Sequence, residues 1–158
     1  MGSVATNMSG KCIYANKDYS HTDHEFERHI TSYRMNQSIY QTHPFSFEEL
    51  KNYLRQEGKN PEYLFRCLQS SMLKVARAIQ PYLGRAKNLQ ETTGFQLFGV
   101  DYIFTDQLHP YLLEWNKGPD MIPKGIADRY MKETVMRDML TQAGIISDGN
   151  VDHLIRLV

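Results

Sequence analysis

Two carboxylates and one carboxamide lie in two segments that have strand-like sequences. Asp101 lies in the apolar segment 95–105, and Glu114 and Asn116 lie in the segment 111–116. Side chains alternate between the two faces of a strand. An antiparallel register that places Asp101 opposite Glu114, or opposite the residue two before it, therefore gathers all three on one face. A register shifted by one residue separates them.

This set of oxygen atoms would suit a hard divalent cation. Two carboxylates side by side repel each other, and neither belongs among apolar neighbours unless a cation compensates the charge. Mg²⁺ prefers oxygen ligands, and Asn116 would add a neutral one. A structural alternative stays open, in which Asp101 caps a bulge and Glu114 pairs with an arginine on an exposed strand edge.

Capping residues predict where two helices begin. Ser46 and Glu49 have the spacing of a capping box, which predicts a helix that continues to about Glu57. Asn60 and Pro61 are typical of a helix start, with the asparagine as the cap and the proline in the first turn.

Other elements are predicted from periodicity and loop length. The short link between the two strand-like segments favours a hairpin. Four apolar residues at helical spacing predict a later helix that ends near Gly144: Met131, Val135, Met139 and Ala143. We also expect strands at 11–15 and 29–36 and a brief helix at 153–157.

Composition limits the classes of partner. Of 158 residues, 41% are hydrophobic and 23% charged, with 18 basic and 18 acidic side chains. A core is therefore expected, and the balanced charge argues against nucleic acid or a membrane surface as partner. Cys12 and Cys67 have no metal or redox spacing, so both are expected to be reduced. No segment has the character of a signal peptide or membrane span, so the cytoplasm is the expected location.

Other chemistries have less support. His21, His24 and His29 could suggest zinc, but their spacing fits no common zinc site. The tyrosines and basic residues of SYRMNQSIY could stack on single-stranded nucleic acid, but no basic cluster accompanies them. No Ser–His–Asp or Cys–His arrangement is recognisable, which leaves a hydrolase with little support.

Three blocks of the sequence resemble one family. They are HITSYRMN, then FQLFGVDYIFTDQLHPYLLEWNKGPDM, then IADRYMKETVMRDML with Asp128, Lys132 and Asp138. In this order they resemble the tubulin–tyrosine ligase-like family, over about residues 11–146. The resemblance implies the C-terminal half of an ATP-grasp domain, an α+β fold in which helices flank an antiparallel sheet.

The resemblance also implies an activity. Members are ATP- and Mg²⁺-dependent ligases that activate a carboxylate as an acyl phosphate, which an amine then attacks. Typical substrates are glutamate, glycine or tyrosine, joined to a protein such as tubulin. By position, Asp101, Glu114 and Asn116 would hold the magnesium ion, and Asp101 and Glu114 would be the catalytic pair. A metal there would neutralise charge that develops on the transferred phosphoryl group.

Further positions are implied for the nucleotide and the substrate. The nucleotide-side residues would be His29, Thr31 and Ser32. The substrate-side residues would be Tyr33, Arg34 and Lys132. A lysine suits the carboxylate of an incoming amino acid. Without the resemblance, Lys132 would be interpreted as a solvated helix residue.

The chain also departs from the family pattern. Ser32 stands where the family usually has Asn, NKGPD replaces a run of small residues, and the upstream lobe that grips the nucleotide has no counterpart. We therefore expect residues 1–10 to be disordered or the ragged start of a fragment, and residues 11–158 to be the C-terminal part of the domain. The alternative function is a truncated, non-catalytic module that binds a protein tail. The expected location is the cytoplasm, free or associated with the cytoskeleton.

Overall fold

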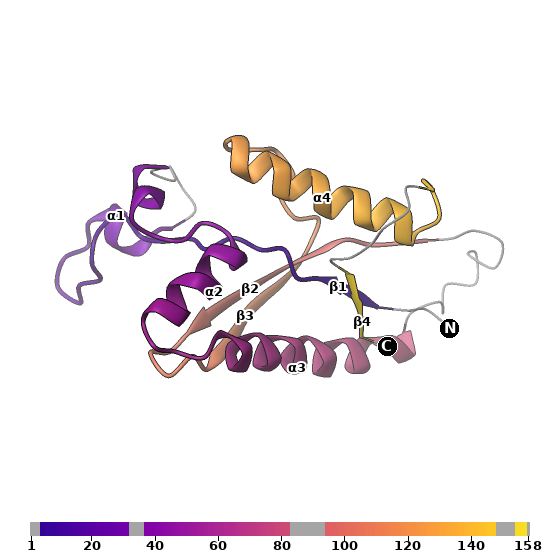
Figure 1. Cartoon of the computed structure of the whole chain (residues 1–158), viewed down its shortest axis with the longest axis horizontal. Helices are drawn as coiled ribbons and strands as arrows, with labels where there is room; N and C mark the ends of the chain where they lie inside the picture. The colour runs from indigo at the N-terminus through magenta and orange to yellow at the C-terminus, as the bar shows by residue number, and fades with distance from the viewer. Residues whose placement is uncertain (1–3, 32–36, 83–93, 148–153, 158) are drawn as a thin grey trace. The chain divides into compact units, whose positions relative to one another are not determined.

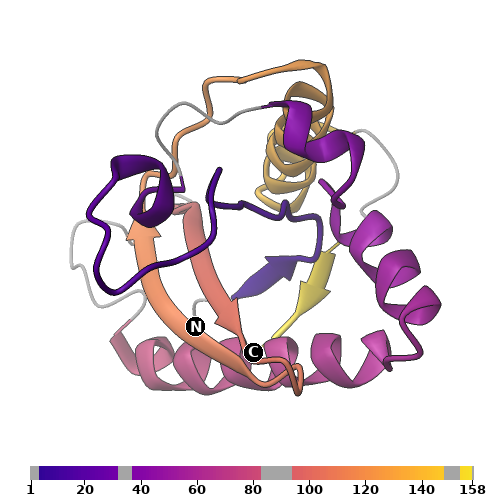
Figure 2. The same cartoon turned by 90° about the vertical axis from the view of Figure 1, so that its left-hand side faces the viewer.

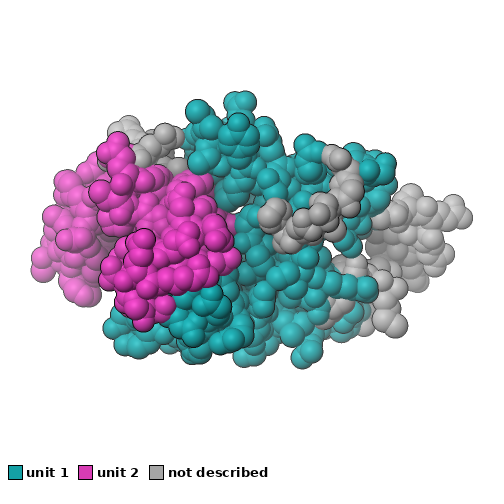
Figure 3. All heavy atoms as spheres, in the orientation of Figure 1, with its two compact units in different colours: residues 1–9, 60–158 teal, residues 10–59 magenta. Residues whose placement is uncertain are grey.

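A computed structural model describes residues 4–31, 37–82, 94–147 and 154–157. The chain divides into two compact units (Figure 3). The smaller unit is Gly10–Lys59, and the larger unit joins Met1–Ser9 to Asn60–Val158. The predicted hairpin and the helix that follows it both belong to the larger unit.

The described part of the smaller unit contains three helical elements: α1 (Phe26–His29), the 3-10 helix η1 (Gln37–Gln41) and α2 (Phe47–Gln56). The predicted capping box of α2 is confirmed. The Ser46 hydroxyl accepts the Glu49 N–H at 3.2 Å, and the Glu49 carboxylate accepts the Ser46 N–H at 3.4 Å. Where the sequence predicts a strand at 11–15, only one isolated bridge forms, between Lys11 and Ser46.

Aromatic rings pack together in the smaller unit. The Tyr40 ring lies edge-on to Tyr14 and Phe45, with ring centroids 6.0 and 5.0 Å apart. The Tyr40 hydroxyl donates to the Cys12 carbonyl at 2.9 Å. Cys12 and Cys67 are both free thiols, and burial raises the pKa of Cys12 above its ordinary value. A raised pKa leaves little thiolate at neutral pH, so we expect Cys12 to react slowly with alkylating reagents.

The larger unit contains the remaining elements: β1 (Ala5–Asn7), α3 (Pro61–Ile79), η2 (Gln80–Tyr82), β2 (Phe98–Phe104), β3 (Pro110–Lys117), α4 (Ile126–Gln142) and β4 (Leu154–Arg156). α3 begins as predicted, because the Asn60 side chain accepts the Tyr63 N–H at 3.2 Å. Buried apolar side chains recur along one face of α3: Leu64, Leu68, Met72 and Ala76. This face forms the centre of the core of the larger unit.

The predicted hairpin is confirmed. β2 and β3 pair antiparallel, and the link is a turn in which Leu108 N–H donates to the Thr105 carbonyl at 2.9 Å. α3 contacts β3 and runs along one side of the hairpin (Figure 1). Figure 2 shows the hairpin as a curved two-stranded ribbon. α4 ends as predicted near Gly144, whose positive φ of 72° suits glycine.

Both ends of the described chain form strands. Leu154–Arg156 is a strand where a brief helix is predicted, so that prediction is wrong. Ala5–Asn7 is a strand within the segment expected to be a disordered or ragged start. The two strands pair with each other, with Thr6 opposite Ile155. Each strand satisfies the backbone groups of the other, and local sequence patterns do not report pairing between distant segments.

The strand predicted at 29–36 is wrong at its first residue. His29 ends the short helix α1, whose last turn is closed by the Ile30 N–H donating to the Phe26 carbonyl at 3.0 Å. The Arg28 side chain holds this turn through Asp23, with Nε 2.8 Å from Oδ2. Residues 32–36 lie outside the described residues.

Helices and small antiparallel sheets together give an α+β fold, the class that the sequence predicts. Among the helices that the structure describes, none combines the length and the apolar character needed to cross a membrane.

Candidate metal centre

The register of the hairpin brings the three predicted metal ligands together. Asp101 pairs directly with Glu114, and Gly99 pairs with Asn116. All three side chains are exposed, and they project from the same face because they occupy paired or alternate positions. The Asn116 amide donates to Glu114 Oε1 at 2.5 Å, which leaves the amide oxygen of Asn116 available as a ligand.

A β-bulge decides this register. Near the turn, Tyr102 pairs with Leu112, whereas Asp101 pairs with Glu114, so Leu113 is the extra residue. If the pairing near the turn continued without the bulge, Asp101 would lie opposite Leu113. Glu114 would then project from the other face. The bulge is therefore part of what places the two carboxylates side by side.

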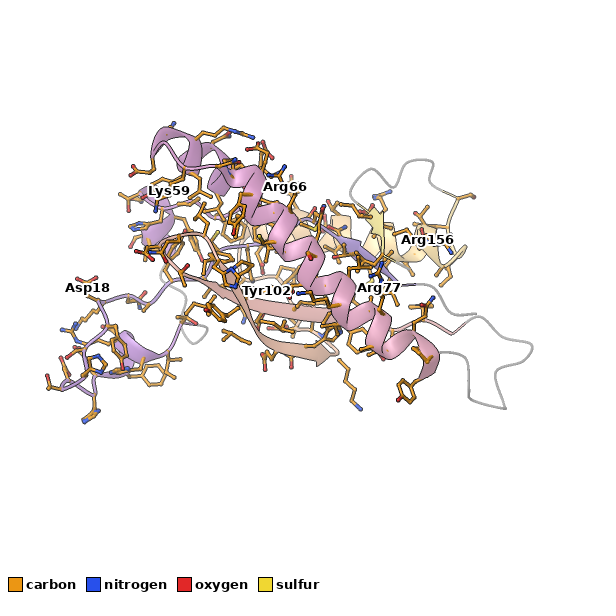
Figure 4. All side chains as sticks on the ribbon, turned by 90° about the horizontal axis from the view of Figure 1, so that it is seen from below. Asp18, Lys59, Arg66, Arg77, Tyr102 and Arg156 are labelled. Carbon is orange, nitrogen blue, oxygen red and sulfur yellow. The ribbon has the colours of Figure 1, made fainter. Side chains whose placement is uncertain are left out.

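The opposite face of the hairpin carries partly buried aromatic side chains. The Phe98 and Trp115 rings meet at a centroid distance of 5.9 Å, and Tyr102 lies near Ser71 of α3 (Figure 4). Burial raises the pKa of Tyr102. Within the described part of the chain, the Trp115 Nε1 is buried without a hydrogen-bond partner. The hairpin thus has one packed face and one exposed, acidic face.

The loop after Asn116 is held close to β2. Gly118 has a φ of 81°, and its N–H donates to the Leu97 carbonyl at 3.4 Å. Pro119 packs over Gly99, where an added Cβ would lie 3.0 Å from the Pro119 Cβ. Glycine at position 99 therefore permits the loop to pass directly beside the carboxylates.

Gly99→Ala tests this close approach. The new methyl group should displace Pro119 and cost about 1–3 kcal/mol of unfolding free energy, as overpacking does. Urea unfolding measures the loss. The double variant Gly99→Ala with Pro119→Gly removes the opposing ring and should recover most of it. Equal stability of Gly99→Ala and the unmodified chain would show that Pro119 can move away from residue 99 without loss of stability.

α4 buries charged rather than apolar side chains: Asp128, Lys132 and Asp138. Lys132 Nζ lies 3.0 Å from Asp128 Oδ2 and donates to the Ile122 carbonyl at 2.7 Å. Asp138 accepts from the Asn7 amide of β1 at 2.7 Å. These contacts were not predicted from the sequence, although the spacing of Asp128 and Lys132 is that of an ion pair on a helix. The predicted contact of Lys132 with an amino acid stays a prediction.

The other predicted site residues lie in the smaller unit. His29 is exposed, with Nε2 2.8 Å from the Asp23 carbonyl oxygen, and Thr31 is exposed. Ser32, Tyr33 and Arg34 lie outside the described residues. The nucleotide-side and substrate-side roles of these five residues stay predictions.

The histidines of the smaller unit contact a tyrosine. The rings of His21 and His29 both lie edge-on to Tyr19, at centroid distances of 4.9 and 5.3 Å. In residues 4–31, 37–82, 94–147 and 154–157, no three or more His, Cys, Asp or Glu side chains are grouped so as to hold a metal ion. The hairpin set has only two such residues, and its third oxygen comes from Asn116. This all-oxygen set fits a hard cation such as Mg²⁺.

A sequence model of the tubulin-tyrosine ligase family matches residues 8–152 of the chain. The chain belongs to the tubulin-tyrosine ligase family. This confirms the resemblance drawn from the three sequence blocks. The matched range includes the hairpin, the loop after it and α4, so the candidate metal centre lies within the family region.

Curated members of the tubulin-tyrosine ligase family are about a quarter identical to this chain over the residues that align. The tubulin monoglutamylase TTLL4 of Mus musculus is 26% identical over 137 residues, which are 84% of this chain and 12% of that protein. The tubulin polyglutamylase ttll-5 of Caenorhabditis elegans is 29% identical over 133 residues, 80% of this chain and 18% of that protein. The chain therefore spans less than a fifth of the length of these relatives.

Proposed function

We propose that this chain supplies the magnesium-holding hairpin of an ATP-dependent ligase that joins an amino acid to a protein. The observation that carries the proposal is the direct pairing of Asp101 with Glu114, with Asn116 beside them on an exposed face. Family membership supports the ligase class, and the α+β fold is compatible with part of an ATP-grasp domain.

The hairpin residues would act by binding and orienting. Asp101 and Glu114 would supply two negative charges to one cation, and the Asn116 amide oxygen would complete the protein side of the shell without further repulsion. A magnesium ion bound there would neutralise charge on the phosphates of ATP while a carboxylate is converted to an acyl phosphate. In this proposal His29, Thr31 and Ser32 face the nucleotide, and Tyr33 and Arg34 face the substrate.

The acceptor proposed for the reaction is tubulin or another protein with a similar tail. The names of the relatives describe a tubulin monoglutamylase and a tubulin polyglutamylase, so glutamate is the first amino acid to test. The cytoplasm, including the cytoskeleton, is the corresponding location.

The test is transfer of labelled glutamate, glycine or tyrosine to tubulin by the protein that carries residues 1–158. We expect incorporation of one of the three, coupled to ADP release and dependent on both ATP and Mg²⁺. Incorporation that persists after the metal is chelated would contradict the proposal. Binding of a tubulin-tail peptide with no ATP turnover would instead support the second candidate, a non-catalytic binding module. The intact acidic face of the hairpin argues against that candidate, because a binding module has no evident use for a metal site.

A further inference from the structure

The buried charges of α4 are arranged around the loop that leaves the candidate metal centre. The Asp128 side chain is 1% exposed and the Lys132 side chain 10% exposed. Asp128 Oδ2 lies 3.0 Å from Lys132 Nζ and also accepts the Lys124 N–H at 2.8 Å. Lys132 Nζ donates to the Ile122 carbonyl at 2.7 Å. Both partners of the ion pair thus bind backbone groups of the loop between β3 and α4.

The same loop is fixed again at its other end. Asp120 closes a local turn, since its carboxylate accepts the Ile122 N–H at 2.9 Å and lies 3.1 Å from Lys124 Nζ. Nearer to Asn116, the loop is held against β2 by Pro119 on Gly99. A series of contacts therefore holds the loop along its length, from the residues that follow Asn116 to the buried side chains of α4.

We propose that the Lys132–Asp128 pair is a positioning device that fixes this loop and so keeps Asn116 beside Glu114 for metal binding. The inference rests on the proposed function of the hairpin. Removing one member of a buried ion pair leaves an uncompensated charge, so the loop would have to open to hydrate it. In this role Lys132 acts through the loop backbone rather than through a contact with the substrate. Two of its three N–H donors point to Asp128 and Ile122, and little of its side chain is exposed.

The experiment compares three variants of the chain. Lys132→Met removes one charge, whereas Asp128→Leu with Lys132→Met removes both and leaves no lone buried charge, so this double variant should fold even where the single one does not. Arg129→Met is the matched control, because it removes a positive charge from an exposed position in the same turn of α4. The measurements are melting temperature, Mn²⁺ affinity by electron paramagnetic resonance of the free ion, and hydrogen exchange at the amides of Ile122 and Lys124.

The positioning role predicts that the double variant melts near the unmodified chain but binds Mn²⁺ on the order of tenfold more weakly, the size of effect expected when a support of a metal ligand is lost. The amides of Ile122 and Lys124 should exchange faster in it. Arg129→Met should match the unmodified chain in all three measurements. Unchanged Mn²⁺ affinity and unchanged exchange in a folded double variant would overturn the proposal.

A kinetic comparison separates this role from a contact with the amino acid. In the protein that carries the chain, the double variant should need a higher Mg²⁺ concentration for half-maximal turnover. Its KM for the amino acid should stay within about twofold of that of the unmodified protein, because a positioning role leaves binding of the amino acid unchanged. A raised amino acid KM at unchanged Mg²⁺ requirement would overturn the positioning role. If the unmodified chain binds no Mn²⁺ at the hairpin, the proposed function fails. In that case, unchanged hydrogen exchange in the double variant would separately show that the pair does not fix the loop.

Discussion

Glu114→Gln is expected to lower ligase turnover of the protein that carries this chain by roughly a thousandfold. The substitution keeps the shape of the side chain but removes one of the two charges that face each other across the hairpin. Loss of metal-based charge stabilisation worth about 4 kcal/mol corresponds to roughly three powers of ten in rate. ADP release at saturating ATP and amino acid measures the effect.

The control for this variant is Glu57→Gln, which removes a carboxylate from an exposed position at the end of α2. It should leave turnover within about twofold, because Glu57 is not among the predicted site residues and the effect of an exposed charge is largely screened by salt. Circular dichroism should show both variants folded. Near-normal turnover by folded Glu114→Gln would remove Glu114 from the catalytic pair.

Leu64→Ala is expected to destabilise the chain by about 3–4 kcal/mol, within the usual range for a leucine truncated in a well-packed core. Leu64 is completely buried on the face of α3 that forms the centre of the core. The loss combines the transfer free energy of the deleted groups with the cost of the cavity that remains.

Urea unfolding measures this loss, with Arg66→Ala as the control on an exposed position of the same helix (Figure 4). The control should change the free energy of unfolding by less than about 0.5 kcal/mol, as is usual at exposed positions. A loss below about 1 kcal/mol for Leu64→Ala would mean that this part of the core collapses around the deletion or is loosely packed.

Local signals in the sequence predicted the elements that carry the site. Ser46 and Asn60 cap α2 and α3 as expected, since a cap depends only on residues within one turn. The short link between two apolar segments was enough to predict the β2–β3 hairpin. Both features are set by neighbours in sequence.

Features set by distant residues were not predicted. The pairing of Thr6 with Ile155 joins the two ends of the described chain, and no pattern in either segment indicates the other. His29 is a different case, because it lies in a helical turn rather than a strand and the contacts that close this turn are local.

The candidate site was predicted in part for the same reason. The alternation of side chains limited Asp101, Glu114 and Asn116 to registers that gather or separate them, and the structure has a gathering register. The bulge at Leu113 and the burial of Lys132 with Asp128 depend on packing around the hairpin and α4. Sequence spacing alone could not supply that information.

The most direct measurement is the broadening of backbone amide resonances by Mn²⁺, which occupies magnesium sites and broadens signals of nearby nuclei. If Asp101, Glu114 and Asn116 form the metal site, amides on both strands beside these residues should disappear at the lowest Mn²⁺ concentrations, and Asp101→Asn with Glu114→Gln should abolish the effect. Broadening that begins instead at the acidic turn around Asp23 and Glu25, unchanged in the double variant, would contradict a metal centre on the hairpin.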